Sequence, residues 1–419
     1  MYLRRRTNIV DVGGTRAEQV GNKALEIEMS GNETPLRVFI ATPNGLGGRG
    51  GIDRMNDMLI DVMSASPEMN VVVERLVTRD NGNIVFAPLV LALALVRLWR
   101  AARQRKVDVL HICLSLKGSA YRKVIIASFA RYCGVPYVVH LHGGGFEYFW
   151  LTVGARLRRA VDRMFVDSEK IVVLGRYWVD VLAGWLPQSR GKIEVFPNAT
   201  YSSTSENEPA SDRRVRLTFL GELGRRKGTP QLMEALGRLA DRSDWTATIA
   251  GNGDVAETRA SARRLGIADR VNIPGWLDSD ATAQVLHRSD ILVLPTFIEN
   301  LPMILLEGFA CGVPVITTPV AAITEVVEHE RNGLLVPVGD IDALADAMRR
   351  LIEDPDLRLR LGRAAREDHA RAYDIRGYAA RLVKLWREVA TNRKWSPSES
   401  QGIARYRGLE GTVQTAPKA

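Results

Sequence analysis

The sequence predicts two Rossmann-like α/β domains that face each other across a ligand-binding cleft. Three observations support this fold class. At 419 residues the chain is too long for a single ordinary core. Short apolar segments alternate with helical segments, which is typical of parallel sheets covered by helices on both faces. A polar segment, residues 201–214, interrupts this alternation and has the composition of a linker.

The first domain is expected at residues 36–205, behind a polar extension formed by residues 1–35. Each expected strand is a short apolar run, and the first one leads into a glycine-rich loop. The strands are expected at 36–41, 70–78, 107–112, 136–141, 170–174 and 192–196, and helices are expected near 53–64 and at 84–103.

The second domain is expected at residues 214–374 and repeats the pattern. Its strands are expected at 215–220, 245–250, 271–273, 291–295, 314–317 and 334–337. Its helices are expected at 228–242, 257–265, 281–288, 302–311 and 341–353. Residues 396–419 are polar and are expected to be disordered. In such domains ligands bind at the carboxyl ends of the strands.

Composition narrows the class of partner. The chain has 46% apolar and 25% charged residues, as soluble globular proteins do, and no apolar stretch follows its basic start, so we expect no signal peptide. The net charge of +9 suggests an anionic partner, and the absence of zinc-ligand spacing, an aromatic RNA signature or a long basic tail argues against nucleic acid. Cys113, Cys133 and Cys311 lack metal-ligand spacing, so we expect buried thiols in a reducing cytoplasm.

The longest apolar stretch, residues 84–96, is too short to span a membrane. Arg97, Arg100, Arg103 and Arg105 follow it. A core helix is one interpretation, and a helix lying on an anionic membrane surface is the other. The two are compatible, because a helix can bury one face and present its arginines to lipid.

The segment 295–307 carries the strongest functional pattern. An apolar strand ends at Pro295, and a helix is expected to begin at Leu301-Pro302, with the proline in its first turn. Glu299 lies in the turn and Glu307 inside the helix. The backbone N–H groups of such a turn favour phosphate, and the two carboxylates can accept hydrogen bonds from sugar hydroxyls. Acidic residues that only complement the helix dipole are the alternative.

Three loops of the second domain are candidates for binding a nucleotide. In the loop after the first strand, Gly221 would let a diphosphate approach the backbone, and Arg225, Arg226 and Lys227 would neutralise it. The glycine-rich turn that follows the next strand offers further polar backbone surface, although it also suits an ordinary turn. The main chain near Ile273 could carry the edge of the base, and a purely structural role is again the alternative. The residues of that turn are Gly251, Asn252 and Gly253.

The first domain offers histidines and glycines. His140 and His142 alternate along one strand end, so they lie on the same face, and either could be a core residue or a donor to phosphate or hydroxyl. No nearby carboxylate completes a metal triad. Gly143 follows directly, and Gly47 and Gly48 belong to a loop that we expect to face the cleft but that lacks Walker spacing.

These motifs together resemble the retaining glycosyltransferases of family 4. The resemblance rests on Glu299 and Glu307 with seven residues between them, on Gly312-Val313-Pro314-Val315, on Glu325 and on the run 332–337. It covers about residues 36–395, strongly in the second domain and weakly in the first. It implies a GT-B architecture with the donor in the second domain and the acceptor in the first. It also implies that the last helices, about 375–395, return to the first domain.

The resemblance also implies roles for individual residues. Glu307 would hold the donor ribose, Glu299 the hydroxyls of the transferred sugar and Lys227 the diphosphate. His142 would lie near the reacting centre. Main-chain groups of Asn300, Leu301, Pro302 and Met303 would line the sugar and phosphate.

Two residues depart from the family pattern. Glu222 stands where many members have arginine, so Arg225 or Arg226 must supply that charge. Asn300 replaces a glycine, which leaves the donor sugar open.

We therefore expect a retaining, metal-independent glycosyltransferase that uses a nucleoside-diphosphate sugar, most often UDP-linked, as substrate and needs no cofactor. The expected acceptor is a saccharide or lipid-linked saccharide in exopolysaccharide, capsule or lipopolysaccharide biosynthesis. The expected location is the cytoplasm, with a peripheral contact at the inner face of the cell membrane through the basic segments 97–106 and 156–163. The alternatives are a GT-B nucleotide-sugar epimerase and a non-catalytic sugar-nucleotide sensor or scaffold.

Overall fold

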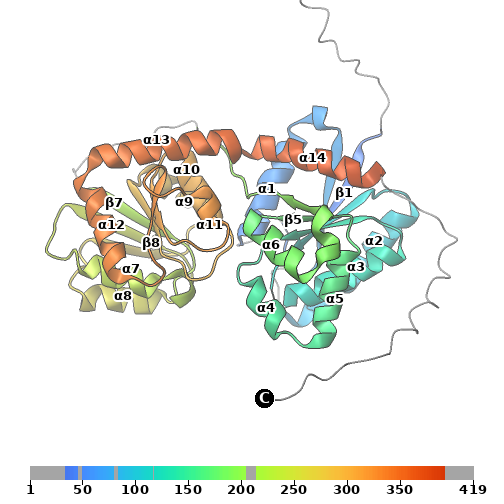
Figure 1. Ribbon diagram of the computed structural model, residues 1–419, viewed down its shortest axis with the longest axis horizontal. Coiled ribbons are helices and arrows are strands. Elements are labelled where there is room, and N and C mark those ends of the chain that lie inside the picture. Colours follow the sequence, from blue (N-terminus) through green and yellow to red (C-terminus); the bar gives the residue numbers. More distant parts are fainter. Residues whose placement is uncertain (1–33, 46–49, 80–83, 117, 204–213, 392–419) are drawn as a thin grey trace, which may run out of the picture. The chain divides into compact units, whose positions relative to one another are not determined.

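The computed structural model describes residues 34–45, 50–79, 84–116, 118–203 and 214–391. The chain divides after Pro35, and both sheets described below lie in the unit that begins at Leu36. The two sheets and their helices are shown in Figure 1. None of the described helices is long and apolar enough to cross a membrane.

The first sheet has six parallel strands in the order β2-β1-β3-β4-β5-β6. These strands are β1 (Leu36–Thr42), β2 (Val71–Val77), β3 (Val109–Leu114), β4 (Tyr137–Leu141), β5 (Lys170–Val173) and β6 (Ile193–Val195). The intervening α-helices are α1 (Gly51–Ser64), α2 (Ala87–Arg103), α3 (Gly118–Tyr132), α4 (Phe146–Thr152), α5 (Ala155–Val166) and α6 (Arg176–Trp185). Short 3-10 helices are η1 (Pro67–Met69), η2 (Ile84–Phe86) and η3 (Pro187–Lys192).

Both faces of this sheet are buried, because successive side chains of a strand point to opposite faces. Phe39 of β1 packs in a core with Leu98 of α2, whereas Val38 packs in the core on the other face. Helix α14 (Ile375–Thr391) contributes Trp386 to that second core and packs against α1 and β3. The end of the chain that the structure describes therefore belongs to the first sheet (Figure 1).

The second sheet is also parallel, in the order β12-β11-β10-β7-β8-β9. Its strands are β7 (Val215–Leu220), β8 (Trp245–Ala250), β9 (Val271–Gly275), β10 (Ile291–Leu294), β11 (Val315–Thr317) and β12 (Gly333–Leu335). Its helices are η4 (Arg225–Lys227), α7 (Thr229–Gly237), α8 (Val255–Arg264), α9 (Ser279–His287), α10 (Met303–Ala310), α11 (Ile323–Val326), α12 (Ile341–Glu353) and α13 (Pro355–Ala372).

The predicted α/β class with two Rossmann-like sheets is confirmed. Counted from β7, the second sheet has the order 3-2-1-4-5-6, in which the direction of winding reverses between β7 and β10. Ligands of such sheets bind at this reversal, beyond the carboxyl ends of the two strands. The predicted domain boundaries stay predictions.

Several predicted element bounds were wrong. The helix expected at 228–242 ends at Gly237, whose lack of a side chain disfavours further helix. Pro302 is not in the first turn of α10 but precedes it as the N-cap, with an extended ψ of 133°. The helix expected at 84–103 begins with the 3-10 turn η2. Cys133, expected to be buried, is half-buried.

Candidate functional site

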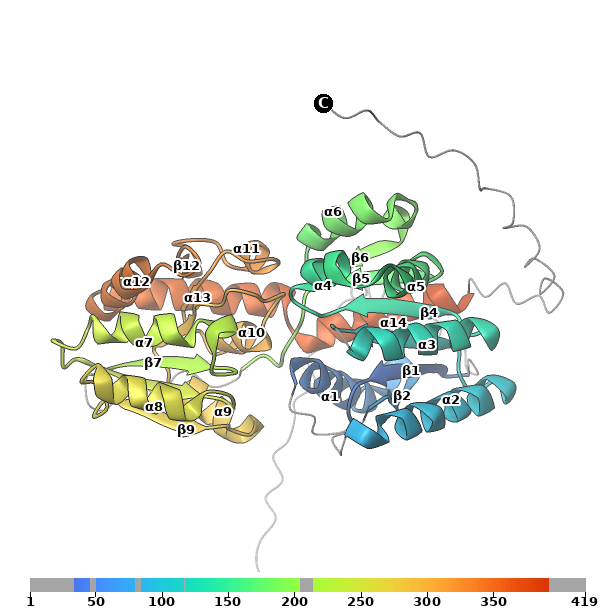
Figure 2. The ribbon, with the colours of Figure 1, turned by 90° about the horizontal axis from the view of Figure 1, so that it is seen from below.

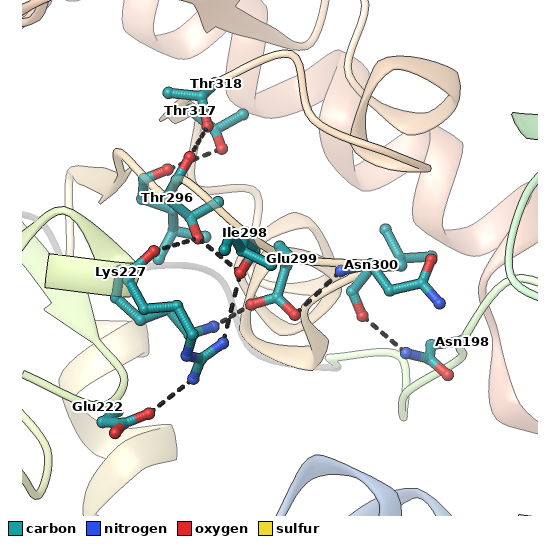
Figure 3. A network of polar contacts seen from close by, with 12 residues as sticks. Asn198, Glu222, Lys227, Thr296, Ile298, Glu299, Asn300, Thr317 and Thr318 are labelled. Atoms are coloured by element: carbon teal, nitrogen blue, oxygen red, sulfur yellow. Dashed lines mark hydrogen bonds and ion pairs between the residues drawn. The ribbon is translucent and has the colours of Figure 1, made fainter. Parts of the chain in front are cut away.

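The loops after β7 and β10 meet where the second sheet reverses its winding. In Figure 3, Lys227 of η4 points at Glu299 in the loop before α10, and their charged groups form an ion pair. Both side chains are mostly buried. The second carboxylate oxygen of Glu299 accepts a hydrogen bond from the backbone N–H of Asn300 at 3.2 Å. The structure thus brings together two residues that are 72 positions apart in the sequence.

Backbone contacts hold these two loops together. The N–H of Phe297 donates to the carbonyl of Arg226 at 2.9 Å, and the Thr296 hydroxyl donates to the same carbonyl at 3.3 Å. Gly228 has a φ of 73°, and a Cβ there would lie 2.0 Å from the Pro295 carbonyl oxygen. Only glycine fits this approach, so Gly228 fixes where Lys227 lies.

The two arginines beside Lys227 differ in their surroundings. Arg226 pairs with Glu222 at 2.7 Å and donates to the Ile298 carbonyl at 3.4 Å. Arg225 is exposed, and its side chain makes no hydrogen bond or ion pair with any other described residue. Glu222, the residue that departs from the family pattern, therefore forms an ion pair with Arg226 and none with Arg225.

The glycines of the neighbouring loops serve close packing between backbones. A Cβ on Gly251 would lie 1.7 Å from the Gly221 carbonyl oxygen, and one on Gly253 would lie 2.3 Å from that of Leu223. The Leu223 N–H donates to the Asn252 carbonyl at 2.6 Å. The loop after β8 therefore packs directly on the loop after β7, which accounts for these glycines without a ligand.

The main chain of Ile273 already has a partner. Its carbonyl accepts two hydrogen bonds from the Arg259 guanidinium, at 2.6 and 3.2 Å, and its side chain is buried. Because Arg259 lies on α8, the Ile273 carbonyl is already used in a contact with that helix.

Glu307 has surroundings different from those of Glu299. Its carboxylate lies 2.7 Å from the guanidinium of Arg54 on α1. Burial raises the pKa of Glu307, and the charge of Arg54 opposes this shift. Both residues line a cavity of about 620 Å³ that also includes Thr200–Ser203 and part of α9. Glu299 and Lys227 are not among its lining residues, so the two glutamates face different surroundings.

Asn300 links the turn before α10 to the end of β4. Its side-chain oxygen accepts a hydrogen bond from the Trp178 indole at 2.9 Å, and its Nδ2 donates to the carbonyls of Leu141 at 3.4 Å and His142 at 3.3 Å. Next to it, Asn198 donates to the Leu301 carbonyl at 2.7 Å (Figure 3). The residue that replaces the family's glycine therefore serves as an anchor in this chain.

Two further contacts tie the same regions together. Glu325 accepts hydrogen bonds from the backbone N–H groups of Arg176 at 2.7 Å and Tyr177 at 2.9 Å, and so caps the start of α6. A Cβ on Gly144 would lie 2.6 Å from the carbonyl carbon of Glu299, whereas one on Gly143 would meet Leu116 at 3.3 Å. The close approach to the turn therefore requires Gly144.

The histidines of β3 and β4 form a buried chain that ends at Trp386. The Trp386 indole N–H donates to His111 Nδ1 at 3.1 Å, and His111 Nε2 lies 3.1 Å from His140 Nδ1. An indole can only donate, so His111 Nδ1 is unprotonated and the neutral ring donates through Nε2. His140 is then protonated at Nε2. Its ring lies 3.8 Å from that of His142, which confirms that the two share a face.

Burial keeps these imidazoles neutral at pH 7. It lowers the pKa of His111 and of His142 to about 3, and that of His140 well below its ordinary value. The second cause at His142 is the charge of Lys123. The buried Nε2 atoms of His140 and His142 have no hydrogen-bond partner among the described residues.

Lys123 on α3 is fully buried beneath the ends of β1 and β2. Its ammonium donates to the Ala41 carbonyl at 2.6 Å and to the Thr78 hydroxyl at 3.2 Å. Burial lowers its pKa to about 7.

Several residues of this region were not indicated by the sequence, because each acts through contacts between distant segments. They are Arg54, Lys123, Trp178, Asn198 and Trp386. Gly47 and Gly48 lie outside the described residues.

The sequence matches two family models in succession. Residues 46–199 match "Glycosyl transferase 4-like domain", and residues 203–368 match "Glycosyl transferases group 1". The chain is similar to a 2-deoxystreptamine glucosyltransferase of Streptomyces kanamyceticus, with 26% identity over 313 residues, which cover 70% of this chain and 80% of that protein. Two further glycosyltransferase relatives match along less than half of their own length.

Two solved structures share the fold. A sucrose-phosphate synthase of Thermosynechococcus elongatus superposes with a TM-score of 0.71 at 18% identity, covering 85% of this chain and all of that one. The Anabaena protein HepE in complex with UDP superposes with a TM-score of 0.67 at 17% identity, covering 84% of this chain and all of that one. At these identities the likeness shows the fold alone.

Two parallel Rossmann-like sheets, with charged loops gathered where the second one reverses its winding, define the GT-B class of folds. Within that class, the matched models place the chain in the family of group 1, 4-like glycosyltransferases.

Proposed function

We propose that this protein is a retaining glycosyltransferase that transfers a sugar from a UDP-linked donor to a saccharide or lipid-linked saccharide. The observation that carries the proposal is the pairing of Lys227 with Glu299 at the carboxyl ends of β7 and β10. A cation and a carboxylate at this position match the two halves of a sugar nucleotide, a diphosphate and a hydroxylated ring. The UDP bound by the HepE protein supports this choice of base.

The chemistry follows from the charge that develops on the leaving group. Cleavage of the anomeric bond leaves negative charge on the nucleoside diphosphate, while positive charge grows on the sugar. A bound diphosphate competes with Glu299 for Lys227, and the exposed Arg225 adds a second cation. These side chains and the N-terminus of α10 stabilise the leaving group, so the proposed reaction needs no metal.

Release of Glu299 from Lys227 gives the carboxylate its proposed role. It then accepts hydrogen bonds from the hydroxyls of the transferred sugar and orients the ring for attack on the face that the phosphate leaves. In this scheme His142 lies near the reacting centre as a neutral imidazole, because burial holds its pKa at about 3. A neutral ring can both donate and accept a hydrogen bond without adding charge beside the developing oxocarbenium ion.

The ribose is assigned to Glu307 and the cavity that it lines. A volume of about 620 Å³ falls in the range of small-molecule sites. Arg54 neutralises the Glu307 carboxylate from α1, so a nucleotide must share this carboxylate with Arg54 or displace the guanidinium. The proposed acceptor class is a lipid-linked saccharide of exopolysaccharide, capsule or lipopolysaccharide assembly, used at the inner face of the cell membrane.

Turnover assays with and without acceptor separate this proposal from its alternatives. We expect purified protein to release UDP from a UDP-sugar only slowly in water and much faster with a lipid-linked saccharide extract, with Glu299→Ala abolishing the stimulated rate. An epimerase would convert the donor sugar without acceptor. A sensor or scaffold would bind donor without turnover, and Glu299→Ala would leave its function intact.

A further inference from the structure

Helix α2 exposes an apolar stripe that no described part of the chain covers. One side of α2 packs on the first sheet through Ala94, Leu98 and Ala101. The opposite side carries four large apolar side chains with between 43% and 61% of their surface exposed. These are Phe86, which ends η2 directly before the helix, and Leu89, Leu93 and Val96 of α2 itself, which together we call the α2 stripe.

The spacing of the α2 stripe places its members in one line. Steps of three, four and three residues repeat on the same side of a helix, and ten residues of helix extend the line over about 15 Å. Single exposed apolar residues are common on protein surfaces, whereas a contiguous line of them marks an interaction site.

The same line continues into cations. Arg100 and Arg103 follow Val96 at the same spacing and are exposed, and Arg103 lies over the Trp99 ring at 5.2 Å. Residues 84–107 contain no aspartate or glutamate. Arg97 is different, because it pairs with Glu74 and lies over Phe39 at 5.3 Å. The outer side of α2 is therefore apolar along most of its length and cationic at its end.

We propose that the α2 stripe docks this protein on the surface of an anionic lipid bilayer. The stripe inserts among the acyl chains, and Arg100 and Arg103 reach the headgroup phosphates, as long cationic side chains do at membrane interfaces. A second copy of the chain fits less well, because residues 84–107 hold no acidic residue that could pair with the arginines of the other copy, whereas lipid phosphates can pair with them. The sequence suggested a helix that presents its arginines to lipid, and the structure adds a line of exposed apolar side chains beside them.

This inference rests on the proposed function, because a lipid-linked acceptor is what makes a bilayer the expected partner. Its test does not depend on enzymatic activity. Full-length protein is sedimented with phosphatidylcholine vesicles that contain about 30 mol % phosphatidylglycerol, and with pure phosphatidylcholine vesicles, at low and high salt. The variant Leu93→Asp is compared with Leu359→Asp, a matched change at an equally exposed leucine (64%) on α13. A second variant, Arg100→Ser with Arg103→Ser, tests the cationic end. Thermal shifts with UDP confirm that each variant retains its donor site.

We expect wild type and Leu359→Asp to bind the anionic vesicles, and Leu93→Asp to bind them at least about tenfold more weakly. The double arginine variant should lose affinity for anionic vesicles and most of its salt dependence. The proposal is overturned if wild type binds no vesicles, or if Leu93→Asp binds as wild type does. Dimerisation that Leu93→Asp abolishes, without any vesicle binding, would assign the stripe to a second copy. If the protein binds vesicles but shows no thermal shift with UDP, the proposed donor site is wrong and the proposed docking on the bilayer still stands.

Discussion

Lys227 and Glu299 are the two side chains on which the proposed chemistry depends most directly. Each neutralises the other in the absence of donor, although both are mostly buried. Removing one partner leaves a buried charge unpaired, which lowers the free energy of unfolding whether or not catalysis is affected. Variants at these positions therefore need a readout that separates binding from turnover.

We expect Glu299→Gln to bind UDP about as well as wild type and to lose about 10²–10³-fold in kcat, because the carboxylate acts on the sugar and not on the diphosphate. Lys227→Met should instead weaken the binding of UDP itself. Calorimetry with UDP and steady-state kinetics would distinguish these results. Equal loss of UDP affinity in both variants would contradict the division of roles.

Arg225→Ala should weaken UDP binding more than Arg226→Ala does. Arg226 is held by Glu222 and by the Ile298 carbonyl, whereas Arg225 has no such contact with another described residue. Both changes remove one exposed cation, so each serves as the control for the other. The reverse order in calorimetric affinities would show that Glu222 does not restrain Arg226 when the donor binds.

The buried histidines predict a loss of stability in mild acid. The pKa of His111 and of His142 is about 3 in the folded protein, against an ordinary value of 6.5. Below pH 6.5 the unfolded chain binds protons that the folded chain cannot, so stability is present above pH 6.5 and is lost as pH falls towards 3. Each such histidine contributes a slope of up to about 1.4 kcal/mol per pH unit.

Thermal midpoints between pH 7.5 and 5.0 measure this effect. His142→Gln should reduce the fall in midpoint across that range, because one of the depressed pKa values is removed. An unchanged slope in the variant would show that His142 is accessible to protons in the folded state.

Helix α14 and strands β3 and β4 together fix the protonation of a buried histidine pair. The Trp386 indole donates to His111, and His111 in turn donates to His140. These residues are contributed by segments as far apart as 275 positions. The sequence indicated that His140 and His142 share a face, because strand alternation requires it. It did not indicate Trp386 or His111, because a contact between a helix and a distant strand leaves no local pattern.

Trp386→Phe should destabilise the protein by about 1–3 kcal/mol, because the buried Nδ1 of His111 loses its donor. Trp245→Phe is a matched control, since the Trp245 indole also donates to a buried partner, the Leu239 carbonyl, at 2.9 Å. Nitrogen NMR of the imidazole rings should show His111 protonated at Nε2 in wild type and in the Trp245 variant. Protonation at Nδ1 in wild type would refute the hydrogen-bond order.

The turn between β4 and α4 is predicted to require glycine at position 144. A Cβ there would lie 2.6 Å from the Glu299 backbone, so Gly144→Ala must displace the turn that carries this carboxylate. We expect a loss of about 1–3 kcal/mol in stability together with reduced turnover. Gly154→Ala, where a Cβ meets nothing within 4 Å, should change neither. Full activity of Gly144→Ala would show that the close approach is absent in the working enzyme.

Across the whole molecule, the sequence predicted the regular parts of the fold better than it predicted the contacts around the candidate site, whose residue roles stay predictions. The bounds of β7 and β8 were correct because short apolar strands between polar turns have a clear pattern. The role of Asn300 was not predictable, because the departure from glycine acquires its meaning from Trp178 and from the carbonyls at the end of β4. Arg54 was missed for the same reason, since its ion pair with Glu307 joins residues 54 and 307 only in three dimensions.

We expect the second sheet to bind a nucleoside-diphosphate sugar with Glu307 at the ribose. The most direct measurement is the thermal shift of the purified protein with UDP-, GDP- and ADP-sugars, beside a Glu307→Ala variant. A ligand at about a hundred times its Kd should add about 2.7 kcal/mol of stability, a shift of a few degrees. We expect a shift with UDP-sugars that is weakened in the variant. No shift with any of these nucleotides would contradict the account.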